Sequence, residues 1–121
     1  IKNNHVVCLL CDRDIEGTGV TVTFFDEETS IPAGPATLSI RTGAKIIPVA
    51  VYQRSKLHHA VVRPPLNSVR QGNLREDVAR ISQDIAKSFE ELILLEPEQW
   101  HLMSPNWPSD HEAVKKHYGK S

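Results

Sequence analysis

The sequence has almost no net charge, no long apolar run and few aromatic residues. Its 14 Lys and Arg oppose 15 Asp and Glu, a formal net charge of −1, which argues against nucleic-acid binding by bulk electrostatics. The longest apolar runs, such as residues 6–11, are far shorter than the roughly 20 residues of a membrane-spanning helix. The chain has 121 residues, 40% of them hydrophobic. It is therefore too apolar to be disordered and has the size of one small domain or a piece of a larger one.

Cysteine is also scarce, because only Cys8 and Cys11 occur. A structural zinc site needs four ligands, and no second CxxC or close histidine pair completes one. In a strand, positions three apart point to opposite faces, so the two sulfurs would not face each other. We expect buried free thiols, with redox or metal use as the alternative. Few cysteines and no visible secretion signal fit a reducing cytosol.

The apolar pattern predicts strands that alternate with helices. Residues 6–11 form a continuous apolar run, typical of a strand buried on both faces. Further strands are predicted at residues 20–25, 45–52 and 57–63, and a polar loop at 26–30. Because the chain starts at Ile1 without Met and the first predicted strand follows almost at once, we expect a piece of a longer protein that lacks its first part.

Helix signals are clearer than strand signals. Residues 35–42 are predicted as a helix, with Pro35 in its first turn and Gly43 just past its end. Asn73 is predicted to cap a long helix, in which apolar residues recur at spacings of three and four as far as Leu92. Pro97 is expected to end it, and residues 110–118 are expected to be a short polar helix or a frayed end. The fold class predicted is α/β, a partial mixed sheet flanked by helices, with at least one sheet edge left for the missing part to cover.

Three groups of residues are candidates for a site. Asp12, Arg13 and Asp14 follow the first predicted strand, where ligands of α/β sheets gather; the alternative is a solvated turn with a local ion pair. Gly34 and Pro35 begin a helix whose N-terminus can receive an anion, or they form a plain turn. The third group, near the C-terminus, consists of Trp100, His101 and Trp107. It is either an anchor at a lipid interface or a cover over the end of the core.

Several common motifs are missing. Gly17 and Gly19 lack the third glycine of a dinucleotide-binding fingerprint, because Val22 stands in its place. There is no phosphate-binding loop, and no serine lies in a nucleophile elbow. An unrelated nucleotide-binding α/β domain is therefore disfavoured.

Several blocks of residues nevertheless occur in a specific order. They are VCLLCDRD (7–14), GV (19–20), FF (24–25), PAGPA (32–36), RTGA (41–44), IPV (47–49) and WH (100–101), followed by Trp107. In this order and spacing the chain resembles the C-terminal half of the bacterial lipid A biosynthesis (lauroyl/myristoyl) acyltransferase family. It is most similar to the phosphatidylinositol mannoside acyltransferase branch. The resemblance implies that residues 1–121 are the C-terminal portion of a single domain of the lysophospholipid-acyltransferase-like kind.

The resemblance also implies a reaction and its surroundings. Such proteins transfer a fatty acyl group from acyl-CoA or an acyl carrier protein to a hydroxyl of a membrane glycolipid, with no other cofactor and no metal. They lie peripherally on the cytoplasmic face of the cell membrane. The histidine of an HxxxxD motif acts as general base, and in the mannoside branch an acidic residue, often Glu, orients it. Asp12 matches that acidic position, whereas Arg13, Asp14, Gly34 and Arg41 match blocks expected to bind substrate or shape the site.

One departure from the family limits this chain. None of its 6 histidines is followed five positions later by Asp, so the HxxxxD motif is expected upstream of Asp12, outside this sequence. The chain alone is therefore expected to be inactive. The alternative is a non-catalytic α/β module that binds lipid or another protein. The sequence leaves open the acceptor lipid, the acyl length, the donor and the oligomeric state.

Overall fold

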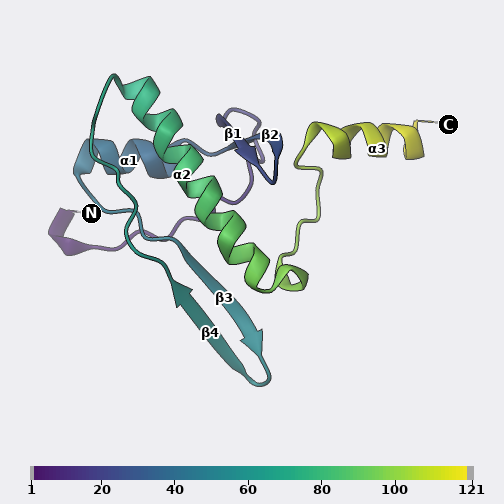
Figure 1. The fold of residues 1–121 in the computed structure, drawn as a ribbon, viewed down its shortest axis with the longest axis horizontal. Coiled ribbons are helices and arrows are strands. Elements are labelled where there is room, and N and C mark those ends of the chain that lie inside the picture. The colour runs from purple at the N-terminus through teal and green to yellow at the C-terminus, as the bar shows by residue number, and fades with distance from the viewer. Residues whose placement is uncertain (1, 120–121) are drawn as a thin grey trace.

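The computed structural model describes residues 2–119, and one long helix organises it. This helix, α2 (Leu74–Leu95), crosses the middle of the molecule, whereas the helix nearest the C-terminus projects away from it (Figure 1). In chain order the other elements are η1 (Lys2–Asn4), β1 (Val20–Phe24), β2 (Glu27–Ile31), α1 (Gly34–Thr42), β3 (Val49–Arg54), β4 (Leu57–Val62), η2 (Pro97–Gln99) after α2, and α3 (Pro108–Tyr118). The mixture of strands and helices is the predicted α/β class.

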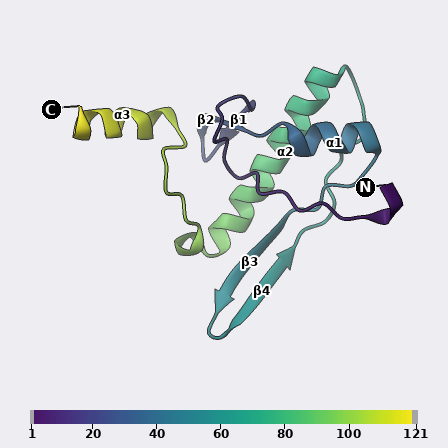
Figure 2. The same cartoon turned by 180° about the vertical axis from the view of Figure 1, so that it is seen from behind.

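The strands form two separate hairpins rather than one sheet. β1 pairs antiparallel with β2, and β3 pairs antiparallel with β4. The β1–β2 hairpin lies beside the middle of α2, whereas the β3–β4 hairpin extends away from the end of the helix (Figures 1 and 2). The prediction of a partial mixed sheet is therefore wrong for residues 2–119, where all pairing between strands is antiparallel.

Two local predictions about strands are also wrong. Residues 6–11 have no regular secondary structure, and Val6 and Leu10 are 87% and 100% exposed. A strand exists only through hydrogen bonds to a neighbouring strand, and none lies beside this run in the described chain. A polar loop is predicted at residues 26–30, but residues 27–31 form β2. Phe25 and Asp26 both adopt left-handed backbone angles (φ 50° and 62°), which make a tight hairpin turn.

The helices begin and end close to their predicted positions. The Asn73 side chain accepts a hydrogen bond from the Glu76 N–H (3.0 Å), which caps α2. Gly43 has a φ of 73° at the end of α1, the left-handed conformation that glycine adopts without strain. α2 ends at Leu95, and Pro97 begins the short helix η2. Local signals near each helix end were therefore sufficient to place it.

The core lies between the β1–β2 hairpin, α1 and α2. Its buried residues come from all four elements: Val22, Phe24, Ile31, Ala36, Val78, Ile81, Ile85 and Ala86. The alternation of buried and exposed residues along β1 and the apolar stripe of α2 place these side chains on facing surfaces.

Two glutamines fasten the hairpins to the helical part of the chain. Gln83 on α2 accepts from the N–H of Thr23 and donates to its carbonyl, both at 2.8 Å. Gln99 of η2 makes the same pair of bonds with Gln53, at 2.7 and 3.1 Å. Each side-chain amide thus bonds to one strand edge as a neighbouring strand would.

Candidate functional site

Asp12, the residue predicted to orient the catalytic histidine, is held by a residue 88 positions away. The indole Nε1–H of Trp100 donates to Oδ2 of Asp12 at 2.9 Å, and both side chains are half-buried. The other carboxylate oxygen, Oδ1, accepts no hydrogen bond from a described residue. Asp12 therefore has one fixed oxygen and one oxygen available to a further donor, the arrangement that an acid needs to orient an imidazole.

Trp100 itself is fixed in an aromatic cluster of four rings. Its members are Phe24, Phe25, Trp100 and Trp107, whose ring centroids are 4.9 to 6.4 Å apart. The indole of Trp107 donates to the Phe24 carbonyl at 2.9 Å. Since both indole N–H groups bond within the chain, Trp100 and Trp107 cover the end of the core, the second of the two predicted roles. His101 is exposed.

Asp14, unlike Asp12, accepts hydrogen bonds from the turn that follows it. Its Oδ1 accepts from the Gly17 N–H at 3.1 Å, and its Oδ2 accepts from the Gly19 N–H at 2.6 Å and the Ser30 hydroxyl at 2.8 Å. Burial favours the neutral acid, but these hydrogen bonds outweigh it and hold the pKa of Asp14 below its usual value. The carboxylate thus organises the turn that leads into β1, although the sequence predicts contact with substrate.

Arg13 and Gly34 lie at accessible positions. The half-buried Arg13 forms no ion pair or hydrogen bond with a described residue. Gly34 is the exposed first residue of α1, and a Cβ added there would meet no atom within 4 Å apart from its two chain neighbours. The α1 start expected to receive an anion is therefore open, and it has no side-chain cap.

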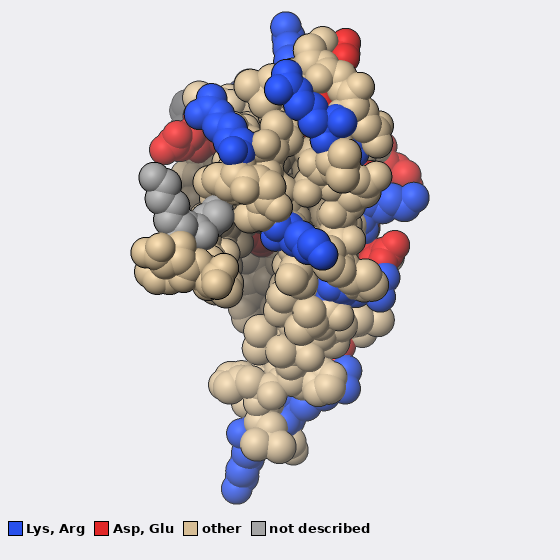
Figure 3. Space-filling view, turned by 90° about the vertical axis from the view of Figure 1, so that its left-hand side faces the viewer, with Lys and Arg blue, Asp and Glu red and all other residues tan. Residues whose placement is uncertain are grey.

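Arg41 lies in an open hollow between α1, the beginning of β1 and the beginning of α2. The hollow has a volume of about 660 Å³. Arg75 lines it as well, a residue that sequence reasoning missed. Lys and Arg side chains stand out on the upper half of the face at the left of Figure 1, with acidic side chains mainly at its edges (Figure 3). Only the proximity of the first turn of α2 to α1 in the fold reveals Arg75.

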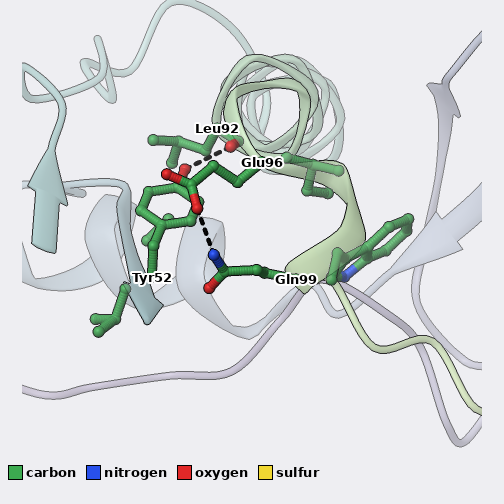
Figure 4. Close-up of a pocket in the computed structure, with 8 residues that line it drawn as sticks. Tyr52, Leu92, Glu96 and Gln99 are labelled. Carbon is green, nitrogen blue, oxygen red and sulfur yellow. Dashed lines mark hydrogen bonds between the residues drawn. The ribbon is translucent and has the colours of Figure 1, made fainter. Parts of the chain in front are cut away.

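A second cavity, of about 110 Å³, lies between β3 and the end of α2. Figure 4 shows that its polar groups bond mainly to each other: Tyr52 donates to the Leu92 carbonyl at 2.5 Å, and Gln99 bonds to Glu96. Burial, together with the negative charge of Glu96, raises the pKa of Tyr52. These contacts fix η2 and with it Trp100, so this cavity supports the position of Asp12.

The cysteines differ from each other. Cys11 is buried, as predicted, whereas Cys8 is exposed, so the prediction for Cys8 is wrong. Burial, reinforced by the negative charge of Asp12, raises the pKa of Cys11 to about 11, which leaves its thiol neutral near pH 7. Across the part of the chain that the structure describes, no three His, Cys, Asp or Glu side chains are grouped to hold a metal ion. Within residues 2–119, no helix is long and apolar enough to cross a membrane.

Comparison with known proteins gives consistent matches. A family model described as bacterial lipid A biosynthesis acyltransferase matches residues 1–109. Phosphatidylinositol mannoside acyltransferase of Mycobacterium tuberculosis (strain CDC 1551 / Oshkosh) is 38% identical over 110 residues, which are 91% of this chain and 33% of that protein. The protein of the same name from Mycolicibacterium smegmatis is 36% identical over 110 residues, 91% of this chain and 34% of its own length. The chain thus spans about a third of the length of these curated relatives.

Proposed function

We propose acyl transfer to a glycolipid as the function of the protein, on the premise that this chain belongs to the bacterial lipid A biosynthesis acyltransferase family. The two relatives are named as phosphatidylinositol mannoside acyltransferases, so a mannosylated phosphatidylinositol is the proposed acceptor. The proposed donor is acyl-CoA or an acyl carrier protein. The proposed domain is of the lysophospholipid-acyltransferase-like kind, peripheral on the cytoplasmic face of the cell membrane.

The reaction needs a base that this chain does not supply. In the proposed mechanism, a histidine of an HxxxxD motif upstream of Ile1 takes the proton of the acceptor hydroxyl while its oxygen attacks the thioester carbonyl. The carbon–sulfur bond then breaks, and the imidazolium returns the proton to the leaving thiolate. Asp12 is a positioning residue in this scheme: its free oxygen, Oδ1, accepts from the imidazole N–H and stabilises the imidazolium.

The hydrogen bond from Trp100 to Asp12 (2.9 Å) is the observation that supports this role most strongly. This bond fixes the Asp12 carboxylate, which belongs to the block at residues 7–14 that resembles the family, against the aromatic cluster. It leaves Oδ1 of Asp12 without a donor from the described chain. Arg13, Gly34 and Arg41 are proposed to contact substrate, because each lies at a position open to a ligand. Asp14 is proposed to act through the turn it holds.

Asp12→Asn tests the proposal in a protein of the relatives' full length that contains this chain. The amide would present N–H where the imidazole needs an acceptor, so acyl transfer should fall at least tenfold, or about 1.4 kcal/mol of transition-state stabilisation. The thermal midpoint of unfolding should change by less than about 3 °C, because the amide oxygen can still accept from Trp100. Wild-type turnover in this variant would refute the role of Asp12.

Trp100→Phe is the matched control for the bond between Trp100 and Asp12. The ring remains in the cluster, but the indole donor is lost, so turnover should fall less than in Asp12→Asn. The two changes together should lower turnover no further than Asp12→Asn alone, because both act through one carboxylate. Full additivity would show that Trp100 does not act through Asp12.

A second function, a lipid-binding or interaction module without catalysis, is favoured by one observation. None of the 6 histidines of this chain belongs to an HxxxxD motif, so the chain alone should show no acyl transfer. The genomic reading frame upstream of Ile1 separates the two functions. A continuous frame that encodes HxxxxD supports the enzyme, and a frame without it supports the module.

A further inference from the structure

We propose that the hollow between α1 and α2 binds the phosphate of an amphipathic phosphate ester through Arg41 and Arg75. The two arginines come from separate helices and line the same cavity, of about 660 Å³. Thr21 and Thr37 add hydroxyl groups to its wall, and none of the described residues that line it is acidic. Two guanidinium groups with hydroxyls beside them are the donor set that proteins use for phosphate.

Arg41 and Arg75 differ from the arginines that stabilise the fold. Arg54 pairs with Glu96, Arg63 with Glu91, and Arg80 with Asp77. By contrast, Arg41 and Arg75 are exposed and form no ion pair or hydrogen bond with a described residue. Their guanidinium groups are therefore available to a ligand without breaking a contact of the protein.

The position of Arg75 in α2 supports a role outside the helix. Arg75 is the second residue of α2, directly before the two acidic residues of the first turn. A cation near a helix N-terminus is unfavourable, because that end of the helix already carries partial positive charge. The charge of Arg75 therefore does not stabilise the N-terminus of α2, whereas a bound phosphate would neutralise it.

The rest of the wall determines which phosphate compounds fit. Val20, Leu74 and Val78 line the hollow as well, and Leu74 remains 39% exposed. Val78 is already largely buried, so an apolar group attached to the phosphate would mainly cover the exposed parts of Val20 and Leu74. The ligand class is therefore a phosphate ester with an apolar neighbour, rather than inorganic phosphate.

The identity of the natural phosphate ester, unlike the binding site, rests on the proposed function. In an acyl transfer to a phosphorylated glycolipid, the group belongs either to the acceptor lipid or to coenzyme A. The binding site itself follows from the residues of this chain, so its test requires no turnover.

Titration of the ¹⁵N-labelled chain with hexyl phosphate is the primary test, read from amide chemical shifts. Saturable shifts should appear at Gly19, Thr21 and Thr37. Arg41→Gln and Arg75→Gln should each weaken binding at least fivefold. Lys87→Gln, which removes one charge from an exposed position of α2 away from the hollow, should change it less than twofold. Inorganic phosphate should bind at least fivefold more weakly than hexyl phosphate.

Two outcomes would overturn the site. One is an equal effect of Lys87→Gln, since binding would then follow net charge alone. The other is the absence of saturable shifts around the hollow. If the site fails while the full-length protein retains Asp12-dependent transfer, only this inference is wrong. If hexyl phosphate binds as expected and the full-length protein transfers no acyl group, the proposed function is wrong and the site stands.

Two further arms identify the source of the phosphate. One titrates coenzyme A, and the other sediments the chain with phosphatidylcholine vesicles with or without phosphatidylinositol. A fivefold loss in the Arg41→Gln/Arg75→Gln variant for coenzyme A assigns the hollow to the donor. The same loss for phosphatidylinositol vesicles assigns it to the acceptor. No dependence on the two arginines in either arm would contradict the inference.

Discussion

Gly19 lies so close to two fixed groups that an added methyl group must displace one of them. A Cβ at this position would lie 2.3 Å from the Ile31 carbonyl oxygen and 2.7 Å from Oδ2 of Asp14. The Ile31 carbonyl belongs to β2, and Asp14 is held by hydrogen bonds from Gly17, Gly19 and Ser30. Gly19→Ala should therefore separate the turn from the β1–β2 hairpin.

The size of this effect follows from the contacts that are lost. The hydrogen bond from the Gly19 N–H to the Asp14 carboxylate (2.6 Å) is charge-assisted, and such bonds contribute about 1.5–3 kcal/mol. The steric displacement adds about 1–3 kcal/mol. The free energy of unfolding should therefore fall by about 3–5 kcal/mol, and the thermal midpoint by roughly 15 °C for a chain of this size.

Thermal unfolding followed by circular dichroism measures this change, with Gly34→Ala as the matched control. A Cβ at Gly34 meets nothing within 4 Å apart from its chain neighbours. Alanine favours a helix, but the Pro35 ring disfavours helical angles at a preceding residue that has a Cβ, so the free energy of unfolding should stay within about 1 kcal/mol of the parent value. A midpoint for Gly19→Ala within about 2 °C of the parent would refute the close approach at Gly19.

Three further predictions concern titration, the aromatic cluster and the thiols. Hydrogen bonds hold the pKa of Asp14 and of Asp77 below the usual value despite the effect of burial. The stabilisation from these two carboxylates is therefore complete above about pH 4 and is lost as the pH falls through the folded pKa values. A free energy of unfolding, measured with denaturant, that is unchanged between about pH 5 and 2.5 would contradict this. Trp107→Phe removes the donor to the Phe24 carbonyl, so the free energy of unfolding should fall by about 1 kcal/mol while sedimentation with vesicles is unchanged. Weaker sedimentation with an unchanged free energy of unfolding would show a membrane anchor. Maleimide at pH 8 should modify exposed Cys8 at least about tenfold faster than Cys11, because burial raises the pKa of Cys11 to about 11. Peptide mass spectrometry measures the two rates, and equal rates would exclude a buried Cys11.

Local signals allowed the helices to be predicted from the sequence. The cap at Asn73, the apolar stripe of α2 and the glycine after α1 each depend on residues a few positions apart. The strands depend on partners that the sequence does not specify. Residues 6–11 have the composition of a buried strand but no neighbouring strand in the described chain, and β2 depends on a turn that begins at Phe25 rather than at a glycine.

The candidate site was predictable only as a set of residues, not as an arrangement. Asp12 and Asp14 have the same chemistry and lie two positions apart, yet one bonds to Trp100 and the other holds a turn. Two glycines, three and five positions after Asp14, were a local sign of the turn. Contact between Asp12 and Trp100 spans 88 positions, and Arg41 and Arg75 line one hollow only because two helices meet, so no local pattern reveals either.

The most direct test of the proposed acyl transfer follows the label from donor to acceptor. A full-length protein that contains this chain would be incubated with radiolabelled acyl-CoA and a phosphatidylinositol mannoside, and the lipids would be separated by thin-layer chromatography. We predict a labelled, more highly acylated glycolipid whose formation falls at least tenfold in Asp12→Asn. If the label stays on acyl-CoA or appears only as free fatty acid with the wild-type protein, the proposed function is contradicted.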